Sequence, residues 1–315
     1  MRPVVIAHRG ACGYLPEHTL PAKALAHAQG ADYLEQDVVA TKDDELVVLH
    51  DIHLDRISNV ASRYPKRARA DGRYYVRDFE LDELRTLSVN HRRDEHGNAV
   101  YPGRSGAATE KLGIHTLAEE LTFIAHLNEA TGRRAGVYPE IKRPAWHKQQ
   151  GVDIAPQMLR VLAQFGYESA DDAAYVQCFD AAELRRLRED LGCRLKLVQL
   201  IGENSWNESG DDFDRLRTKR GLKSIAGVAD AIGPWLQHTY KLTPKLKKPT
   251  SSGLVENAHG LGLAVHPYTL RVDDLPTDFA NVALLLQFLL AKLNVDGIFS
   301  DFPDVVIDFI KSGRK

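Results

Sequence analysis

Short apolar runs alternate along the chain with longer segments in which apolar residues recur every three or four positions. The short runs, rich in β-branched residues, predict strands at Val4–Ala7, Tyr33–Thr41, Leu46–His50, Gly136–Glu140, Ala174–Gln177, Leu195–Gln199, Ala229–Ile232, Leu263–His266 and Gly297–Ser300. The longer segments predict helices, including Leu20–Ala28, Leu117–Ala130, Ile154–Phe165, Ala181–Leu191, Ser252–Leu261 and Ala280–Leu293. This alternation predicts an α/β fold with a parallel sheet covered by helices.

One of these strands cannot be parallel to its predecessor. Residues 42–45 alone separate Thr41 from Leu46, whereas a parallel crossover needs a dozen or more residues. The two strands therefore predict an antiparallel hairpin. Setting its return strand aside leaves eight parallel strands, which predicts a (β/α)8 TIM barrel with an extra antiparallel hairpin strand. An open doubly wound sheet is the alternative.

The hairpin also predicts a register. If Asp43 and Asp44 form a two-residue turn, Asp37 lies opposite His50.

The strand–helix rhythm breaks between residues 53 and 112. This stretch is rich in Gly, Arg and Tyr and has little strand or helix period, and it is too long for a simple connection. We interpret residues 53–112 as a small inserted domain on the C-terminal rim of the barrel, with the barrel itself formed by residues 1–52 and 113–315. At that position it would shape access to the barrel mouth.

Composition narrows the class of protein. The formal net charge of -2 argues against a nucleic-acid partner, and no window approaches the ~20 apolar residues of a transmembrane segment. The chain enters its first strand with no recognisable signal peptide. The cysteines Cys12, Cys178 and Cys193 fit neither a disulfide framework nor a zinc motif, so we expect buried thiols.

Catalytic groups of a TIM barrel lie at the C-terminal ends of its strands. The polar and aromatic residues expected at these tips are His8, Arg9, Glu35, Asp37, His50, Glu140, Lys142, Gln177, Tyr268 and Phe299.

Three of these side chains are carboxylates. Glu35 and Asp37 are two residues apart and point to the same side of a strand, and Glu140 joins them from the next parallel strand. Hard oxygen ligands of this kind suit one divalent metal ion, Ca²⁺ or Mg²⁺. The alternative is that the carboxylates pair with Arg9 and Lys142 and hold no ion.

Two histidines converge on these carboxylates. His8 comes from the first strand and His50 from the end of the hairpin, and two imidazoles can exchange protons with an attacking and a departing oxygen. A divalent cation with Arg9 and Lys142 can hold a phosphoryl group and neutralise its developing charge. This set predicts phosphodiester cleavage.

The same residues lie in stretches that resemble the glycerophosphodiester phosphodiesterase family. The stretches occur in the family's order and span nearly the whole chain: AHRGACGYLPEHTLPA, YLEQDVVATKDDELVVLHD, YPEIK, HPYTLR and DGIFSDFPD. The resemblance implies a barrel, a divalent metal, and hydrolysis of small-molecule glycerophosphodiesters, such as glycerophosphocholine and glycerophosphoethanolamine, to sn-glycerol 3-phosphate and an alcohol.

Residue by residue, the resemblance implies roles at matching positions. The metal carboxylates fall on Glu35, Asp37 and Glu140, the acid–base histidines on His8 and His50, the phosphate contacts on Arg9 and Lys142, and the glycerol side of the pocket on Gln177, Tyr268 and Phe299. Glu17 would brace Arg9 or serve as a plain helix-start acid. Cys12, His18 and His266 depart from the commoner family residues, and the last two resemble a longer, periplasmic branch; a cytoplasmic location is the alternative. Monomer and homodimer both stay open.

Two other functions fit a barrel of this kind but are less compatible with this sequence. A barrel lipase of the sphingomyelinase D or phosphatidylinositol phospholipase C type should carry an apolar rim, whereas the insertion is polar and Arg-rich. A binding protein that kept the barrel and lost catalysis should have a broken catalytic set, whereas both histidines and all three carboxylates are present.

Overall fold

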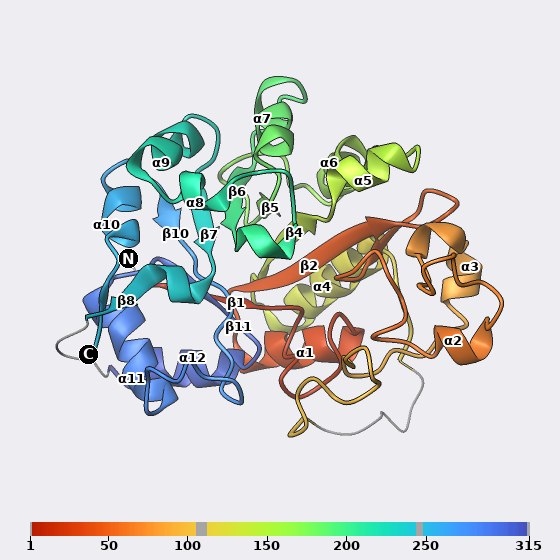
Figure 1. Ribbon diagram of the computed structural model, residues 1–315, viewed down its shortest axis with the longest axis horizontal. Helices are drawn as coiled ribbons and strands as arrows, with labels where there is room; N and C mark the ends of the chain where they lie inside the picture. The colour runs from red at the N-terminus through yellow and green to blue at the C-terminus, as the bar shows by residue number, and fades with distance from the viewer. Residues whose placement is uncertain (1, 105–111, 244–247, 314–315) are drawn as a thin grey trace.

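Eight parallel strands follow one another around a ring in chain order (Figure 1). The structure is a computed structural model that describes residues 2–104, 112–243 and 248–313. The parallel strands in the described part of the chain are β1 (Val4–Ala7), β2 (Tyr33–Ala40), β4 (Gly136–Ile141), β5 (Tyr175–Cys178), β6 (Lys196–Ile201), β7 (Ala231–Pro234), β10 (Ala264–Val265) and β11 (Gly297–Ser300).

The ring closes between its last two strands. The backbone N–H of Asp296 donates to Val265 (3.0 Å) and that of Phe299 to Pro267 (3.1 Å). Leu270 N–H then donates to the carbonyl of Phe299 (2.8 Å). These bonds join β11 to β10 and to the residues after it, so the fold is the predicted (β/α)8 barrel and the open sheet is excluded.

Helices surround the ring, and their ends carry ordinary capping signals. The Thr19 hydroxyl accepts from Ala22 N–H at the start of α1, and Thr116 and Glu119 form a capping box at the start of α4. The outer helices are α1 (Leu20–Gln29), α4 (Leu117–Thr131), α5 (Pro144–Gln149), α6 (Ile154–Gln164), α7 (Ala181–Glu189), α8 (Phe213–Leu216), α9 (Lys219–Ala226), α10 (Leu254–His259), α11 (Val282–Leu286) and α12 (Pro303–Lys311).

Several predicted elements differ from the observed ones. The helix expected over Ala280–Leu293 is α11 followed by a π-helical segment, Gln287–Lys292. The helix expected over Ser252–Leu261 is the shorter α10. Short elements that the pattern does not reveal include the two-stranded sheet of β8 (Tyr240–Leu242) and β9 (Pro249–Ser251) and the 3-10 turns η2 (Asn204–Trp206) and η3 (Leu236–Thr239).

The antiparallel hairpin is present, formed by β2 and β3 (Leu46–Val48), but its predicted register is wrong by one residue. Leu49, not His50, lies opposite Asp37, and its N–H donates to the Asp37 carbonyl (2.9 Å). The slip arises because the loop has three residues, 42–44, instead of two. Asp44 takes the left-handed conformation (φ 64°) that ends a three-residue loop, and Asp tolerates this conformation.

The segment after the hairpin builds a hydrophobic cluster of its own outside the barrel. It contains α2 (Val60–Arg63), η1 (Val76–Asp78) and α3 (Leu81–Leu84), which lie beyond one end of β2 at the right of Figure 1. Its buried members are Leu54, Ile57, Val60, Tyr74, Val76, Phe79, Leu84, Leu87 and Val89, which pack with Val39, Val47 and Leu49 of the hairpin. Residues 105–111 lie outside the described part, and the domain boundaries at 53 and 112 stay a prediction.

The barrel interior is packed below the strand tips. Ile6, Tyr138, Val198, Ala231 and Phe299 form a buried cluster there. All three cysteines are buried and free, as expected. Within the described ranges, no helix is long and apolar enough to cross a membrane.

Candidate active site

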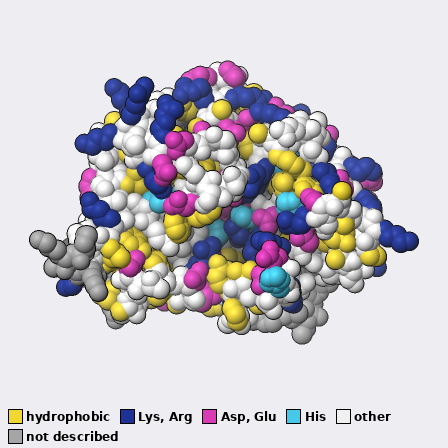
Figure 2. Space-filling view, viewed as in Figure 1, with side chains coloured by type: hydrophobic (Ala, Val, Ile, Leu, Met, Phe, Trp, Pro, Cys, Tyr) yellow, Lys and Arg dark blue, Asp and Glu magenta, His cyan; other side chains and the backbone are white. Residues whose placement is uncertain are grey.

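A cavity of about 280 Å³ opens at the C-terminal ends of the parallel strands. Figure 2 shows histidine, acidic and basic side chains gathered in the hollow at the centre of this face. Nine of the ten predicted side chains line it: His8, Arg9, Glu35, Asp37, His50, Glu140, Gln177, Tyr268 and Phe299. The tenth, Lys142, lies behind the wall and bonds to Glu140 (Nζ to Oε1 2.8 Å).

The turn after β1 explains why a strand ends in His-Arg-Gly. Arg9 and Gly10 both take positive φ angles (57° and 88°), and a Cβ on Gly10 would lie 2.8 Å from the backbone of Ala22. Glycine is therefore required there, because α1 passes too close for a side chain. The strained Arg9 residue turns its N–H toward Glu35, to whose Oε2 it donates (2.5 Å).

The three predicted carboxylates are buried together. Glu35 and Asp37 share one face of β2, and Asp37 lies directly across from Glu140 of β4 in the parallel register. Burial and the Asp37 carboxylate raise the pKa of Glu35 to about 8, and burial also raises the pKa of Glu140. Burial alone would raise the pKa of Asp37 too, but His50 and Lys142 hold it well below its ordinary value.

The neighbouring cations neutralise only part of the negative charge of these carboxylates. Arg9 Nε lies 3.4 Å from Asp37 Oδ2, and Lys142 pairs with Glu140, so the ion pairs of the no-metal alternative exist. The second oxygen of Asp37, Oδ1, is buried without a hydrogen-bond partner among the described residues. Three buried carboxylates of which two have raised pKa values need a further positive charge to stay ionised.

A divalent ion would supply that charge, and the residues present fit one. Ligand atoms of His18, Glu35 and Asp37 lie within 4.8 Å of one another, and His18 Nε2 bonds to Asp37 Oδ2 (2.7 Å). Glu140 stands outside this group. The donors are mainly carboxylate oxygens, which Ca²⁺ and Mg²⁺ prefer.

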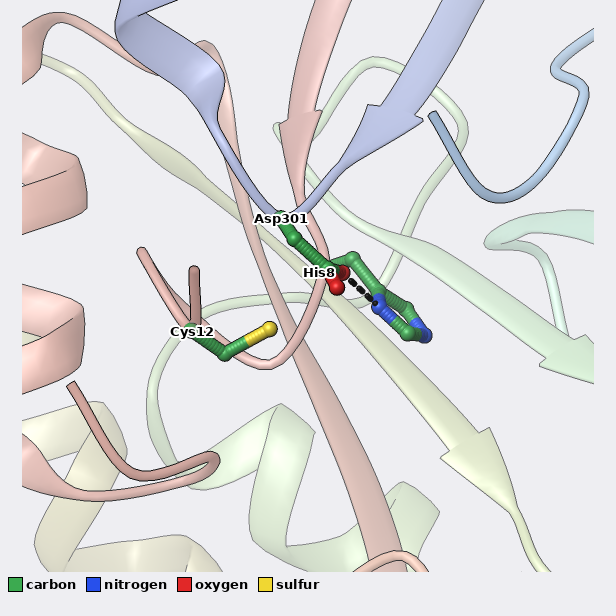
Figure 3. Close-up of side chains that lie close together, drawn as sticks. All are labelled: His8, Cys12 and Asp301. Atoms are coloured by element: carbon green, nitrogen blue, oxygen red, sulfur yellow. Dashed lines mark hydrogen bonds and ion pairs between the residues drawn. The ribbon is translucent and has the colours of Figure 1, made fainter. Parts of the chain in front are cut away.

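Each of the two predicted histidines is held by an aspartate. His8 Nδ1 lies 2.6 Å from Asp301 Oδ1, and His50 Nδ1 lies 2.5 Å from Asp51 Oδ1. Because an ionised carboxylate only accepts, Nδ1–H is the donor in both pairs, and Nε2 is left as the basic nitrogen. Figure 3 shows the second ring nitrogen of His8 pointing away from Asp301.

Burial and neighbouring cations lower the pKa of both imidazoles. Burial, followed by the charge of Arg9, lowers the pKa of His8 to about 3. Burial, Arg9 and Lys142 lower the pKa of His50 as well. The Lys142 ammonium lies 3.4 Å from His50 Nε2 and donates toward it.

The three residues assigned to the glycerol side of the pocket differ in the polar groups that they leave free for a substrate. The Gln177 amide donates to Glu35 Oε1 (3.3 Å), and its own oxygen has no partner in the described structure. Tyr268 donates its hydroxyl to the Ile201 carbonyl (3.1 Å), so that hydroxyl is already engaged. Phe299 is buried on the barrel floor.

Sequence reasoning assigned no role to several residues of the site. Asp51 and Asp301 directly follow strand tips, which is a usable signal for the partners of His50 and His8. Phe179 follows β5 in the same way. Leu200 follows the predicted strand Leu195–Gln199, and Thr269 and Arg271 lie in the stretch HPYTLR. Nothing in the local pattern indicates the remaining cavity residues, which are Trp206, Glu208 and Trp235.

The sequence model of the glycerophosphoryl diester phosphodiesterase family matches residues 8–305. The chain belongs to this family. The family match takes in every site residue described above. It confirms the resemblance drawn from the sequence motifs and makes the protein a phosphodiesterase.

Relatives agree over nearly the whole chain. It is 41% identical to the glycerophosphodiester phosphodiesterase of Haemophilus influenzae, over 98% of this chain and 90% of that protein. It is 34% identical to the Treponema pallidum protein of the same name, over 98% and 91%.

Solved structures of the family share the barrel. The fold is similar to a Silicibacter pomeroyi protein described as a glycerophosphoryl diester phosphodiesterase (TM-score 0.73, 24% identity, 99% of this chain and 95% of that chain). It is also similar to an Oleispira antarctica phosphodiesterase in complex with the product sn-glycerol-3-phosphate (TM-score 0.64, 19% identity, 98% and 97%).

Proposed function

We propose that this phosphodiesterase hydrolyses glycerophosphodiesters, including glycerophosphocholine and glycerophosphoethanolamine, to sn-glycerol 3-phosphate and an alcohol. We further propose that the reaction depends on a divalent ion and on His8 and His50 as a proton-transfer pair. The observation that carries the proposal is the pair of Asp-bound histidines on one cavity with three buried carboxylates. The direct test is release of sn-glycerol 3-phosphate from glycerophosphocholine by the purified protein.

Glu35, Asp37 and Glu140 would hold the ion. When bound, the ion neutralises charge on the phosphoryl oxygens and orients them. The chain adds its own positive charge through Arg9, which lines the cavity, and through Lys142 behind it. Burial strengthens the attraction of these cations for a phosphate oxygen because the local dielectric constant is low.

The two histidines divide the proton transfers between them. As the nucleophile's oxygen forms its bond to phosphorus, one imidazole accepts the proton from that oxygen at Nε2. The bond from phosphorus to the leaving alkoxide breaks, and the other histidine, as imidazolium, protonates the alkoxide. The negative phosphate of a bound substrate favours the protonated form of this second histidine, against the burial that lowers its pKa.

Two nucleophiles fit this scheme. Water would give sn-glycerol 3-phosphate directly. The glycerol 2-hydroxyl would first give a cyclic phosphate, which water then opens with the histidines in exchanged roles.

Two tryptophans and Glu208 in the cavity lining support a cationic headgroup such as choline. Trp206 and Trp235 line the cavity with ring centroids 5.3 Å apart, and a Cβ on Gly202 would lie 2.7 Å from the Trp206 ring. Burial would raise the pKa of the adjacent Glu208, but Lys142 and Arg143 hold it below its ordinary value, so the carboxylate is ionised. Aromatic faces beside a carboxylate attract quaternary ammonium groups.

Trp206→Ala is expected to lower kcat/KM for glycerophosphocholine by roughly 2- to 30-fold, the usual range for a cation–π contact. Activity on a diester with an uncharged glycerol headgroup should change much less. The matched control is Trp146→Ala, since Trp146 stacks on Tyr75 (5.8 Å) away from the cavity. Equal losses on both substrates would remove the headgroup assignment.

The pH dependence of kcat/KM is expected to be bell-shaped. The histidine acting as base must be neutral, so activity falls as the pH drops below its pKa; the acid must be protonated, so activity falls as the pH rises above its pKa. Burial and Arg9 lower the pKa of both His8 and His50. The low-pH limb, which reports the histidine acting as base, is therefore expected below the ordinary imidazole pKa of about 6.5. Alanine variants of either histidine should each lose one limb, and an unchanged profile in both would contradict the pairing.

A soluble substrate is favoured over a membrane lipid. The large apolar side chains that the described surface exposes are scattered along the chain: Tyr14, Val100, Trp206, Leu242, Leu261 and Leu284. Only Trp206 among them lines the cavity. A lipase that works on a bilayer needs a contiguous apolar rim.

A further inference from the structure

Two arginines of the segment outside the barrel lie at the catalytic end of the barrel. Arg92 and Arg104 both come from this segment, and their side chains are only 15% and 6% exposed. Burying a guanidinium is unfavourable unless carboxylates surround it. The carboxylates that the two arginines contact include Asp301 and Asp51, which hold the two histidines.

Arg104 reaches the partner of His8. Its Nη2 lies 2.7 Å from Asp301 Oδ2, while the other carboxylate oxygen, Oδ1, bonds to His8. Arg104 is itself fixed by a fork of two bonds to Asp273 (2.8 and 3.2 Å). Arg271 gives Asp301 a second cationic contact (3.0 Å).

Arg92 does the same for His50. Its Nη1 lies 2.5 Å from Asp51 Oδ2, while Asp51 Oδ1 bonds to His50. Its other nitrogens bond to Glu17 (3.0 and 2.6 Å), and Glu17 bonds to Arg9 (3.2 Å). One arginine thus fixes the partners of both a candidate proton-transfer group and a candidate phosphate ligand.

We infer that Arg92 and Arg104 are positioning residues, through which the segment outside the barrel orients the two histidines for proton transfer. The inference rests on the proposed function. In each pair the arginine occupies one carboxylate oxygen and leaves the other for the imidazole Nδ1–H, which fixes the ring and its tautomer. The segment outside the barrel then controls catalytic competence through these two arginines.

The arginines also contribute to lowering the pKa of both aspartates, Arg92 as the largest lowering cause at Asp51 and Arg104 as a smaller one at Asp301. Burial alone would raise the pKa of Asp51, but Arg92 and His50 hold it well below its ordinary range. The same opposition acts on Asp301, whose pKa is held down by Arg271, His8 and Arg104. Without this charge a buried carboxylate would take up a proton and lose its hold on the histidine.

Alanine and lysine variants of the two arginines test the inference. Arg92→Ala and Arg104→Ala are expected to lower kcat by roughly 10- to 100-fold, as loss of an outer orienting partner commonly does. KM should change little in Arg104→Ala, whereas it should rise in Arg92→Ala because Glu17, the partner of Arg9, loses two bonds. Lysine variants should recover part of the loss because they restore the charge without the planar fork. Arg92→Ala should cost more, since Asp301 keeps Arg271 whereas Asp51 has no second arginine contact in the described structure.

The matched control is Arg93→Ala, the neighbouring exposed arginine, which bonds to the Gly97 carbonyl (2.7 Å). Low-field ¹H NMR of the histidine Nδ1–H protons in the folded protein distinguishes a positioning role of the two arginines from a role in stability alone. These resonances should shift or vanish in the Arg92 and Arg104 variants and persist in the control.

The outcomes are distinguishable. No turnover by the native protein on any glycerophosphodiester defeats the proposed function itself. Native turnover with unaltered kcat in the alanine variants overturns the inference. A kcat loss with unchanged Nδ1–H resonances, or with equal loss in the Arg93 control, also overturns it. Loss of the resonances with recovery in the lysine variants supports it.

Discussion

His8→Ala is expected to lower kcat by roughly 10²–10⁴, the usual contribution of a positioned proton-transfer group. The imidazole lies at the tip of β1, its Nδ1 is committed to Asp301 (2.6 Å), and Nε2 is available for the reaction. The fold should survive, because the side chain lies at a strand tip rather than in the hydrophobic clusters of the barrel. Steady-state kinetics and a thermal melt measure the two effects separately.

His50→Ala is expected to cause a loss of similar size, and the double variant should lose far less than the product of the two. Acid and base serve a single displacement, so removing one makes the other largely ineffective. A matched control is His266→Ala; His266 is buried and bonds to Tyr138 (2.8 Å) in the barrel interior. Near-native kcat in either single variant would show that the histidine is a structural neighbour, and the two-histidine scheme would fail.

The sequence predicts the barrel and most of its cavity because both depend on local patterns. Strand–helix alternation sets the ring of strands, and residues two apart on a strand share a face, which placed Glu35 beside Asp37. Strand tips of a barrel converge, so His8 and Glu140 could be brought to the same cavity from distant parts of the chain. These steps use only period and position.

What the sequence does not predict depends on loop conformation and on contacts between distant segments. The predicted hairpin register is wrong by one residue because Asp44 takes a left-handed conformation that makes the loop three residues long. His50 reaches the cavity even so, since it follows the paired part of the strand. Arg92 and Arg104 have no periodic signal, because their positions are set by the irregular path of the segment outside the barrel.

Removal of divalent ions is expected to abolish turnover, and Ca²⁺ or Mg²⁺ should restore it. Burial and Asp37 raise the pKa of Glu35 to about 8. Asp37 Oδ1 has no hydrogen-bond partner in the described part of the chain, although Lys142 Nζ lies 3.9 Å from it. A cation bound there would let all three carboxylates ionise. The measurement is activity after EDTA treatment and gel filtration, with EDTA already saturated with Ca²⁺ as the control.

Site variants separate metal loss from general inhibition. Asp37→Asn and Glu140→Gln should lower the metal content measured by elemental analysis and lower kcat with it. Glu45→Gln is the matched control, because Glu45 is exposed at the hairpin turn and away from the cavity. Full activity in a protein shown by elemental analysis to hold no metal would contradict the proposed metal dependence.

The most direct test of the account is a coupled assay for sn-glycerol 3-phosphate, run on glycerophosphocholine with the native protein, the EDTA-treated protein, and the His8 and His50 variants. The proposed mechanism predicts stoichiometric sn-glycerol 3-phosphate and choline from the native protein, none after chelation, recovery with Ca²⁺ or Mg²⁺, and losses of roughly 10²–10⁴ in each histidine variant. Release of phosphocholine and glycerol instead, or product formation that survives chelation and loss of both histidines, would contradict it.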